Sequence, residues 1–149
     1  MCSSDLLGLV SGRPPALDLE TEAALHGLLI AAAREDLLAS GHDCSDGGLS
    51  IALAESAISG GHGVAVTVPG DLPAHVALFS ESASRAVVSV APECEEPLTV
   101  LAAEHGVPLF RLGETGGPRV VFDGLFEATV DELREAYESA IPRLMGEGD

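Results

Sequence analysis

The stretch HDCSDGGLSIALAESA, residues 42–57, constrains the fold more than any other part of the sequence. A short extended run ending at Cys44 is followed by the pair Gly47-Gly48, after which apolar residues recur at helical spacing. Glycine allows the backbone to turn tightly at such a junction. The segment therefore predicts a strand, a tight turn and a helix whose free N–H groups point outward, an arrangement that favours bound anions.

Turn residues and apolar periodicity predict the other elements. Residues 1–17 are interpreted as an irregular lead-in, and Asp18 as the N-cap of a helix that extends to Gly41. The remaining elements are expected as strand 41–44, helix 49–59, strand 62–68, helix 71–79, strand 86–91, helix 93–105, two strands in VPLFRLGET and PRVVFDG joined through Gly116-Gly117, and a helix over 129–144 that begins with the capping box Thr129-x-x-Glu132. This order predicts one α/β domain over residues 18–149, a sandwich with a mixed sheet.

The charge of the chain limits its partners. Seven basic residues, all arginine, stand against 24 acidic ones, which gives a formal net charge of −17 at pH 7. Nucleic-acid backbones and anionic membranes need a basic surface, so neither is expected as a partner. Hydrophobic residues make up 46% of the chain and aromatic residues only 3%, which predicts an aliphatic core. We expect a cytoplasmic protein with a well-solvated acidic surface.

Further functional classes lack their sequence signatures. The three cysteines, Cys2, Cys44 and Cys94, lie far apart, so neither a disulfide framework nor a zinc site is expected. The apolar runs are too short to span a bilayer. The sequence has no G-x-S-x-G, Walker A, G-x-G-x-x-G or H-E-x-x-H pattern, and no residue of the chain is given a catalytic role.

The HDCSDGG segment has two interpretations. In the first, Ser45 or Asp46 caps the following helix and Asp43 is solvated, which the pattern alone favours. In the second, the amides around Gly47 and Gly48 bind a phosphate. Because two carboxylates would repel a bare phosphate, a divalent metal held by oxygen ligands would then lie between them.

The second polar motif is FSESASR, directly before the strand AVVSVA. Arg85 can bind a phosphate or carboxylate with two hydrogen bonds, and Ser82 and Ser84 can donate to oxyanions. The alternative is a helix end at which Glu81 and Arg85 form an ordinary pair four residues apart. The candidate nucleotide- or phosphate-binding residues of the two motifs are Ser45, Asp46, Gly47, Gly48, Glu81, Ser82, Ser84 and Arg85.

At these two motifs the chain resembles the phosphoribosylformylglycinamidine synthase family of purine biosynthesis. HDCSDGGLSIALAESAISGGHGVAV is similar to the family pattern H-D-x-S-D-G-G-L-x-x-x-L-A-E, and LFSESASRAVVSV is similar to L-F-G-E-S-x-S-R-x-x-V-S-V. The segments GRPPALDL and GVPLFRLGETGG also fit. The similarity covers nearly the whole chain and points to the AIR synthase-related C-terminal domain in the second half of that enzyme.

The resemblance implies a three-layer α/β/α sandwich with a mixed sheet, partly ferredoxin-like. It also implies a reaction in which formylglycinamide ribonucleotide, ATP and glutamine-derived ammonia give formylglycinamidine ribonucleotide, with Mg²⁺ and ATP or ADP bound. The first aspartate of the family motif is a magnesium ligand in some relatives, which falls on Asp43. The serine of that motif contacts nucleotide, which falls on Ser45. Ser80 stands where the family usually has glycine.

The resemblance also implies a longer enzyme, whose ATP-binding domain and catalytic histidine would precede Met1. We therefore expect a fragment that is inactive alone. Its expected partners are the upstream ATP-binding domain, a glutaminase subunit or domain, and a nucleotide, and an exposed docking face would allow a homodimer. The alternative is a stand-alone nucleotide-binding or interaction module of this family without catalysis.

Overall fold

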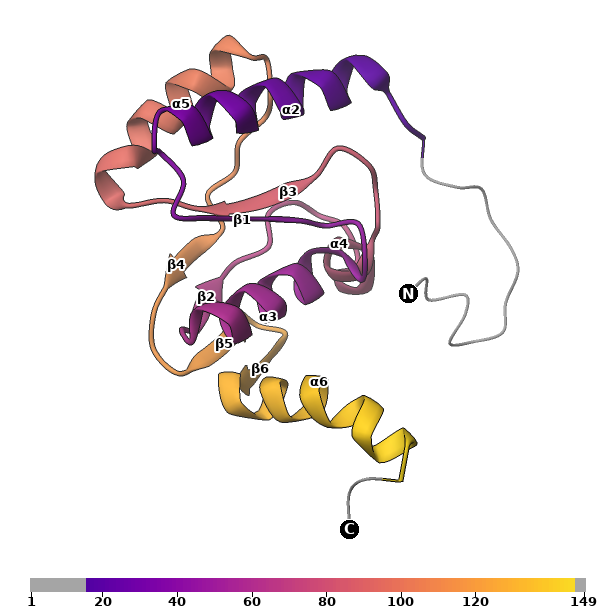
Figure 1. The fold of residues 1–149 in the computed structure, drawn as a ribbon. Helices are drawn as coiled ribbons and strands as arrows, with labels where there is room; N and C mark the ends of the chain where they lie inside the picture. Colours follow the sequence, from indigo (N-terminus) through magenta and orange to yellow (C-terminus); the bar gives the residue numbers. More distant parts are fainter. Residues whose placement is uncertain (1–15, 147–149) are drawn as a thin grey trace. The chain divides into compact units, whose positions relative to one another are not determined.

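The computed structural model describes residues 16–146, which form a mixed α/β structure (Figure 1). The helices are α2 (Leu19–Arg34), α3 (Gly48–Gly60), α4 (Ala74–Phe79), the 3₁₀ turn η1 (Pro92–Cys94), α5 (Glu95–Glu104) and α6 (Val130–Leu144). The strands are β1 (Ser40–Asp43), β2 (Val64–Val66), β3 (Ala86–Ser89), β4 (Gly113–Thr115), β5 (Arg119–Phe122) and β6 (Phe126–Thr129). The expected fold class, helices with a mixed sheet, is confirmed.

The described residues form two compact units. The first contains the residues up to Ala52 and Leu72–Arg111, and the second contains Leu53–Asp71 and the residues from Leu112 onward. Helix α3 passes from the first unit into the second between Ala52 and Leu53. The interpretation of residues 18–149 as one domain stays a prediction.

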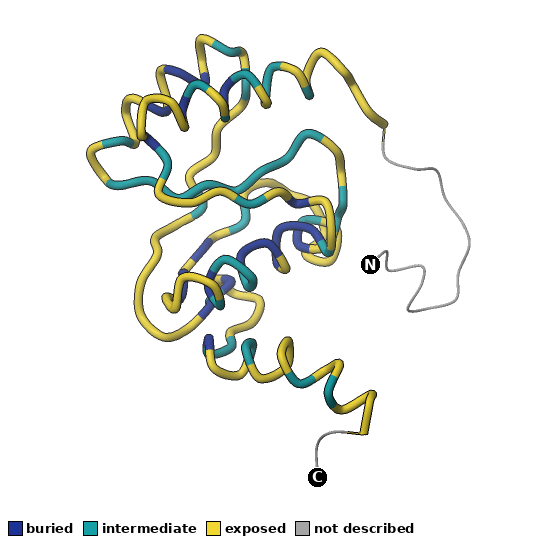
Figure 2. Tube along the Cα trace, viewed as in Figure 1, coloured by how far each residue is buried: buried dark blue, intermediate teal, exposed yellow. Residues whose placement is uncertain are grey.

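An aliphatic cluster on α2 and α5 forms the core of the first unit. Its buried members are Leu28, Ala32, Leu37, Leu98, Leu101 and Ala102. Val88 of β3 and the following Val90 pack against this cluster, and Figure 2 shows buried stretches on both helices. Burying each leucine contributes about 2 kcal/mol relative to exposure. The core is therefore built from small aliphatic side chains, as the composition predicts.

The second unit contains a four-stranded mixed sheet in the order β4-β2-β5-β6. Strand β2 pairs antiparallel with β4 and parallel with β5, and β5 pairs antiparallel with β6. Val64 and Val66 of β2 and Val120 and Phe122 of β5 are buried, while Ala65 between the two valines is exposed. This alternation gives the sheet one buried face.

One expectation about this sheet is wrong, and one strand has no counterpart in the predicted elements. The segments around β4 and β5 were expected as neighbours joined through Gly116-Gly117, but β2 lies between these strands. The glycine pair carries the chain across the end of β2, where Gly63 donates to the carbonyl of Gly117 and accepts from the N–H of Gly116. Strand β6 has no counterpart among the strands predicted from the sequence, because its four residues, FEAT, are too few for their alternation to stand out, and their burial in the structure does not alternate.

Both helix caps expected from the sequence are confirmed. The Asp18 carboxylate accepts hydrogen bonds from the N–H groups of Glu20 and Thr21 at the start of α2. At the start of α6, the Thr129 hydroxyl accepts from the N–H of Glu132, and the Glu132 carboxylate accepts from the N–H of Thr129. This reciprocal arrangement is a capping box, and it satisfies two N–H groups that have no partner inside the helix.

A close backbone approach fixes the start of α3. A Cβ atom at Gly48 would lie 2.8 Å from the carbonyl oxygens of Leu78 and Ser80, and Gly48 has a φ of +69°. Only glycine fits this contact without moving the backbone. The sequence is therefore constrained here by packing as well as by the turn.

Within residues 16–146, no helix is both long enough and apolar enough to cross a membrane.

We predict that Thr129→Ala lowers the free energy of unfolding by about 1 kcal/mol, because it removes the side-chain half of the capping box. The hydrogen bonds from Thr129 also lower the pKa of Glu132 below 4.5. The contribution of Glu132 to stability is therefore complete above about pH 4.5 and disappears as the pH falls through its lower folded-state pKa. Urea unfolding at neutral and acidic pH measures both effects, with Thr67→Ala, an exposed threonine in a loop, as the control. An equal effect of the two substitutions would contradict the cap.

We also predict that Gly48→Ala destabilises the chain by roughly 2–5 kcal/mol, because the methyl group overlaps backbone atoms and the φ is left-handed. Gly60→Ala is the matched control, since a Cβ atom at Gly60 meets nothing within 4 Å. Thermal unfolding of the two variants compares them directly. Similar melting temperatures would show that the close approach at Gly48 is relieved without cost.

Candidate functional site

Antiparallel pairing of β1 and β3 brings the two sequence motifs together. Asp43 at the end of β1 lies opposite Ala86 at the start of β3. Beyond this pair, the N–H of Cys44 donates to the carbonyl of Arg85 at 3.2 Å. Residues 43–48 and 80–85 therefore meet at one end of the two-stranded sheet, inside the first unit. Sequence analysis identified each motif, but the pattern gave no basis for their contact.

Asp43 is an exposed carboxylate at the last position of β1. Hydrogen bonds from Ser45, its hydroxyl foremost, lower the pKa of Asp43, and desolvation opposes them. His42 in β1 is half-buried, and its Nδ1 atom lies 2.7 Å from the backbone oxygen of Asp43 and 3.5 Å from Oδ1. Asp43 is therefore ionised at neutral pH, as an oxygen ligand for a metal must be.

The start of α3 receives a capping carboxylate from the second motif. The N–H of Gly47 donates to Oε1 of Glu81 at 3.1 Å, across 34 residues of sequence. Glu81 therefore acts on the N-cap N–H in the same way as the glutamate of a capping box. Asp46 is exposed, and Gly47 and Gly48 both have positive φ. The proposed phosphate-binding N–H of Gly47 is thus already paired with a carboxylate.

Residues 80–85 form an irregular connection between α4 and β3. The alternative of an ordinary helical pair between Glu81 and Arg85 is wrong, because this segment is not helical. The Arg85 guanidinium donates to the carbonyl of Ser80 at 3.1 Å, and the hydroxyls of Ser80 and Ser82 are 2.7 Å apart. Ser80 has φ −67°, which every L-residue adopts, so the serine is unstrained and no glycine is required at this position.

Ser84 has a different hydrogen-bond partner from the other serines of the motif. Its hydroxyl donates to Oε2 of Glu22 on α2 at 2.5 Å, and Oε1 of Glu22 lies 3.0 Å from Nε2 of His26. Glu22 is not among the site residues predicted from the sequence. The only local signal was its spacing of four residues from His26, which is common on exposed helix faces.

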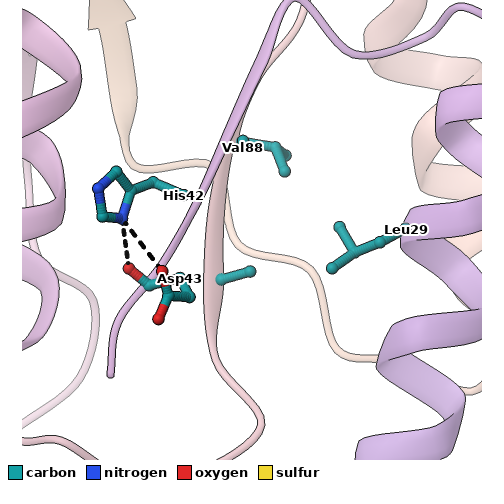
Figure 3. A pocket seen from close by; sticks show the side chains of 6 residues that line it. Leu29, His42, Asp43 and Val88 are labelled. Atoms are coloured by element: carbon teal, nitrogen blue, oxygen red, sulfur yellow. Dashed lines mark hydrogen bonds and ion pairs between the residues drawn. The ribbon is translucent and has the colours of Figure 1, made fainter. Parts of the chain in front are cut away.

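A shallow hollow of about 270 Å³ borders Asp43. Leu29 of α2 and Val88 of β3 contribute apolar walls, and Gly41, His42 and Ala86 complete the lining. Figure 3 shows Leu29 and Val88 on one side of β1 and the His42 ring on the other. The hollow therefore combines an apolar wall with one carboxylate at its rim.

Cys44 and Asp43 are the two groups of the site whose chemistry the structure defines. The Cys44 thiol is buried, and burial raises its pKa, with the Arg85 charge opposing the shift, so Cys44 is a protonated thiol rather than a nucleophile. In the described chain, no group of three or more histidine, cysteine, aspartate or glutamate side chains could hold a metal ion. Asp43 can therefore supply one ligand to a magnesium ion whose other ligands are phosphate oxygens and water, a common mode for this ion.

Comparison with known proteins gives curated relatives of high similarity. The chain is 53% identical over 142 residues to the phosphoribosylformylglycinamidine synthase subunit PurL of Thermobifida fusca, covering 93% of this chain and 18% of the relative. It is 49% identical over 139 residues to the same subunit of a Nocardioides species, again covering 93% of this chain and 18% of the relative. The chain thus spans about a fifth of the length of these relatives, and the expected resemblance is confirmed.

The fold is also similar to solved structures. Phosphoribosylformylglycinamidine synthase II of Thermotoga maritima matches with a TM-score of 0.71 and 23% identity, over 80% of this chain and 22% of that chain. At this level of identity the likeness shows the fold. A sequence model for the AIR synthase related protein, C-terminal domain, matches residues 2–123, which include both motifs of the site. The chain therefore belongs to the family of AIR synthase related protein C-terminal domains.

Proposed function

We propose that the chain is the C-terminal domain of a phosphoribosylformylglycinamidine synthase subunit. In this role it takes part in the ATP-dependent conversion of formylglycinamide ribonucleotide to formylglycinamidine ribonucleotide, a ligase reaction with glutamine as nitrogen donor. The observation that carries the proposal is the 53% identity to the Thermobifida fusca subunit PurL over 93% of this chain. The alternative of a stand-alone module without catalysis has no support among the relatives.

Within this enzyme, the site at the end of β1 and β3 would bind the phosphate groups of a nucleotide. Arg85 would supply the positive charge, with Ser45, Asp46, Gly47, Gly48, Ser82 and Ser84 as further candidate residues of the two motifs. Solved structures of Thermotoga maritima PurL with this fold include complexes with ATP and with ADP, which supports a nucleotide as the ligand. The carboxylate of Glu81 would have to share the Gly47 N–H with a phosphate, or leave it.

Magnesium fits the site through Asp43. A bound magnesium ion would neutralise phosphate charge next to this carboxylate. The residues of this chain perform the remaining tasks. Asp43 stays ionised because Ser45 lowers its pKa, and Arg85 is held near the loop by its bond to Ser80. We assign no residue of this chain to proton transfer or to a covalent bond with substrate.

The partners and the location follow from the same proposal. We expect an ATP-binding domain in the same polypeptide and a glutaminase subunit or domain to complete the enzyme, and a solved Thermotoga maritima structure is described as PurLQS. Large apolar side chains of α6, Tyr137, Ile141 and Leu144, are exposed, as expected for a domain that docks on another.

Cys44 and Cys94 are free thiols, which agrees with a reducing, cytoplasmic location.

We predict that Asp43→Asn in the full-length enzyme weakens binding of magnesium–nucleotide at this site by roughly tenfold or more, because the amide lacks the charge that a hard cation needs. The melting temperature should stay unchanged, because Asp43 is exposed. Isothermal titration with ADP and Mg²⁺ measures the affinity. Asp71→Asn, which removes an exposed charge elsewhere, is the control. Equal affinities of the two variants would leave Asp43 without a role in metal binding.

We also predict that the 149-residue chain alone makes no formylglycinamidine ribonucleotide. Phosphoryl transfer needs the triphosphate and its metal ions held from several sides, and this chain offers one side. An assay with formylglycinamide ribonucleotide, ATP and ammonium salt, with the complete enzyme as positive control, measures the product. ATP-dependent product formation by the chain alone would refute this assignment of roles.

A further inference from the structure

Ser84 has a backbone conformation that calls for an explanation. Its φ is +60°, and Asp36 is the other non-glycine residue of the described chain with positive φ. L-residues rarely adopt this conformation, and it persists where the surrounding structure holds it. Ser84 directly precedes Arg85, the one cation of the candidate phosphate site.

The Glu22 carboxylate holds Ser84 from the neighbouring helix. The hydrogen bond from the Ser84 hydroxyl to Oε2 is short, at 2.5 Å, and joins residues 62 apart in the sequence. Hydrogen bonds to an ionised acceptor are stronger than those between neutral groups. The other carboxylate oxygen faces Nε2 of His26 at 3.0 Å, and the Glu22 side chain is 29% exposed. With both oxygens engaged, the orientation of Glu22 is fixed.

The conformation of Ser84 sets how Arg85 enters β3. The carbonyl of Arg85 accepts a hydrogen bond from the N–H of Cys44, the residue after β1. The Arg85 guanidinium donates to the carbonyl of Ser80. Both contacts depend on the direction of the peptide between Ser84 and Arg85. Glu22 therefore holds Ser84, the residue before Arg85, in its left-handed conformation.

We infer that Glu22, acting through Ser84, is a positioning residue that holds Arg85 in place for a nucleotide phosphate. Glu22 does not itself contact the anion, because its two oxygens lie against Ser84 and His26. A carboxylate would also repel a phosphate. This inference rests on the proposed function, since it takes Arg85 as the phosphate-binding cation.

The test measures the Kd of the full-length enzyme for ADP in the presence of Mg²⁺ by isothermal titration. This is the same affinity that Asp43→Asn is expected to weaken. Glu22→Ala and Ser84→Ala are each expected to raise Kd about tenfold, as for loss of a hydrogen bond to a charged group. The double variant should bind ADP no more weakly than either single variant, because both substitutions remove the same hydrogen bond between Ser84 and Glu22. Glu22→Gln should restore Kd to within about threefold, because its amide oxygen still accepts from Ser84. Glu20→Ala, an exposed glutamate in the same helix turn, should match the wild type.

The outcomes separate this inference from the proposed function. If Arg85→Ala weakens ADP binding while Glu22→Ala does not, the inference is wrong and the proposed function stands. If Arg85→Ala leaves binding unchanged, the phosphate site itself is wrong. Equal losses in Glu22→Ala and Glu20→Ala, or no rescue by Glu22→Gln, would overturn the positioning role in favour of a general charge or stability effect.

A second pair of variants covers the case in which the alanine variants fold poorly. Ser84→Gly adopts the left-handed conformation without strain but lacks the hydroxyl, so its melting temperature should be preserved while ADP binding weakens. The pair Ser84→Gly and Glu22→Gln then carries the test. Wild-type affinity of Ser84→Gly would show that Arg85 needs no restraint from Glu22.

Discussion

The pairing of β1 with β3 is the interaction on which the site depends. It places Asp43 opposite Ala86, so each motif begins where the other ends. A two-stranded sheet is marginal by itself, and here the α2 and α5 cluster packs on Val88 and supports it. The close contact of Gly48 with the backbone of residues 78–80 then fixes the start of α3 against the end of α4. A change in the register of β1 would separate Asp43 from Arg85.

Charge explains why this site needs a metal ion or further cations if it binds phosphate. The chain carries a net charge of −17, and the two motifs contain one arginine, Arg85, and three carboxylates, Asp43, Asp46 and Glu81. One guanidinium cannot offset three carboxylates and a polyphosphate together. The Gly47 N–H is also directed at Glu81. If the site binds phosphate as we propose, cations beyond Arg85 are therefore required.

Local features were predicted from the sequence, whereas long-range pairings were not. The caps at Asp18 and Thr129 depend on residues within three positions, and both are confirmed. The neighbour of β4 depends on β2, some fifty residues away, and the Gly116-Gly117 pair is equally compatible with a hairpin and with a crossing over the end of β2. In the site, each motif was visible alone. The contact between Glu81 and the start of α3 could not be predicted, because Glu81 is 34 residues from Gly47 and no local pattern connects them.

Ser80 and Ser84 are two serines with opposite backbone requirements. At Ser80, where the resemblance implies a glycine, φ is −67° and any L-residue fits, so glycine is not needed there for conformation. At Ser84 φ is +60°, and a glycine would avoid a cost of about 1 kcal/mol or more. A serine at this position is explained by its hydroxyl, which gains a strong hydrogen bond to Glu22 and offsets that cost. The side chain, and not the backbone, therefore determines which residue type suits the turn before Arg85.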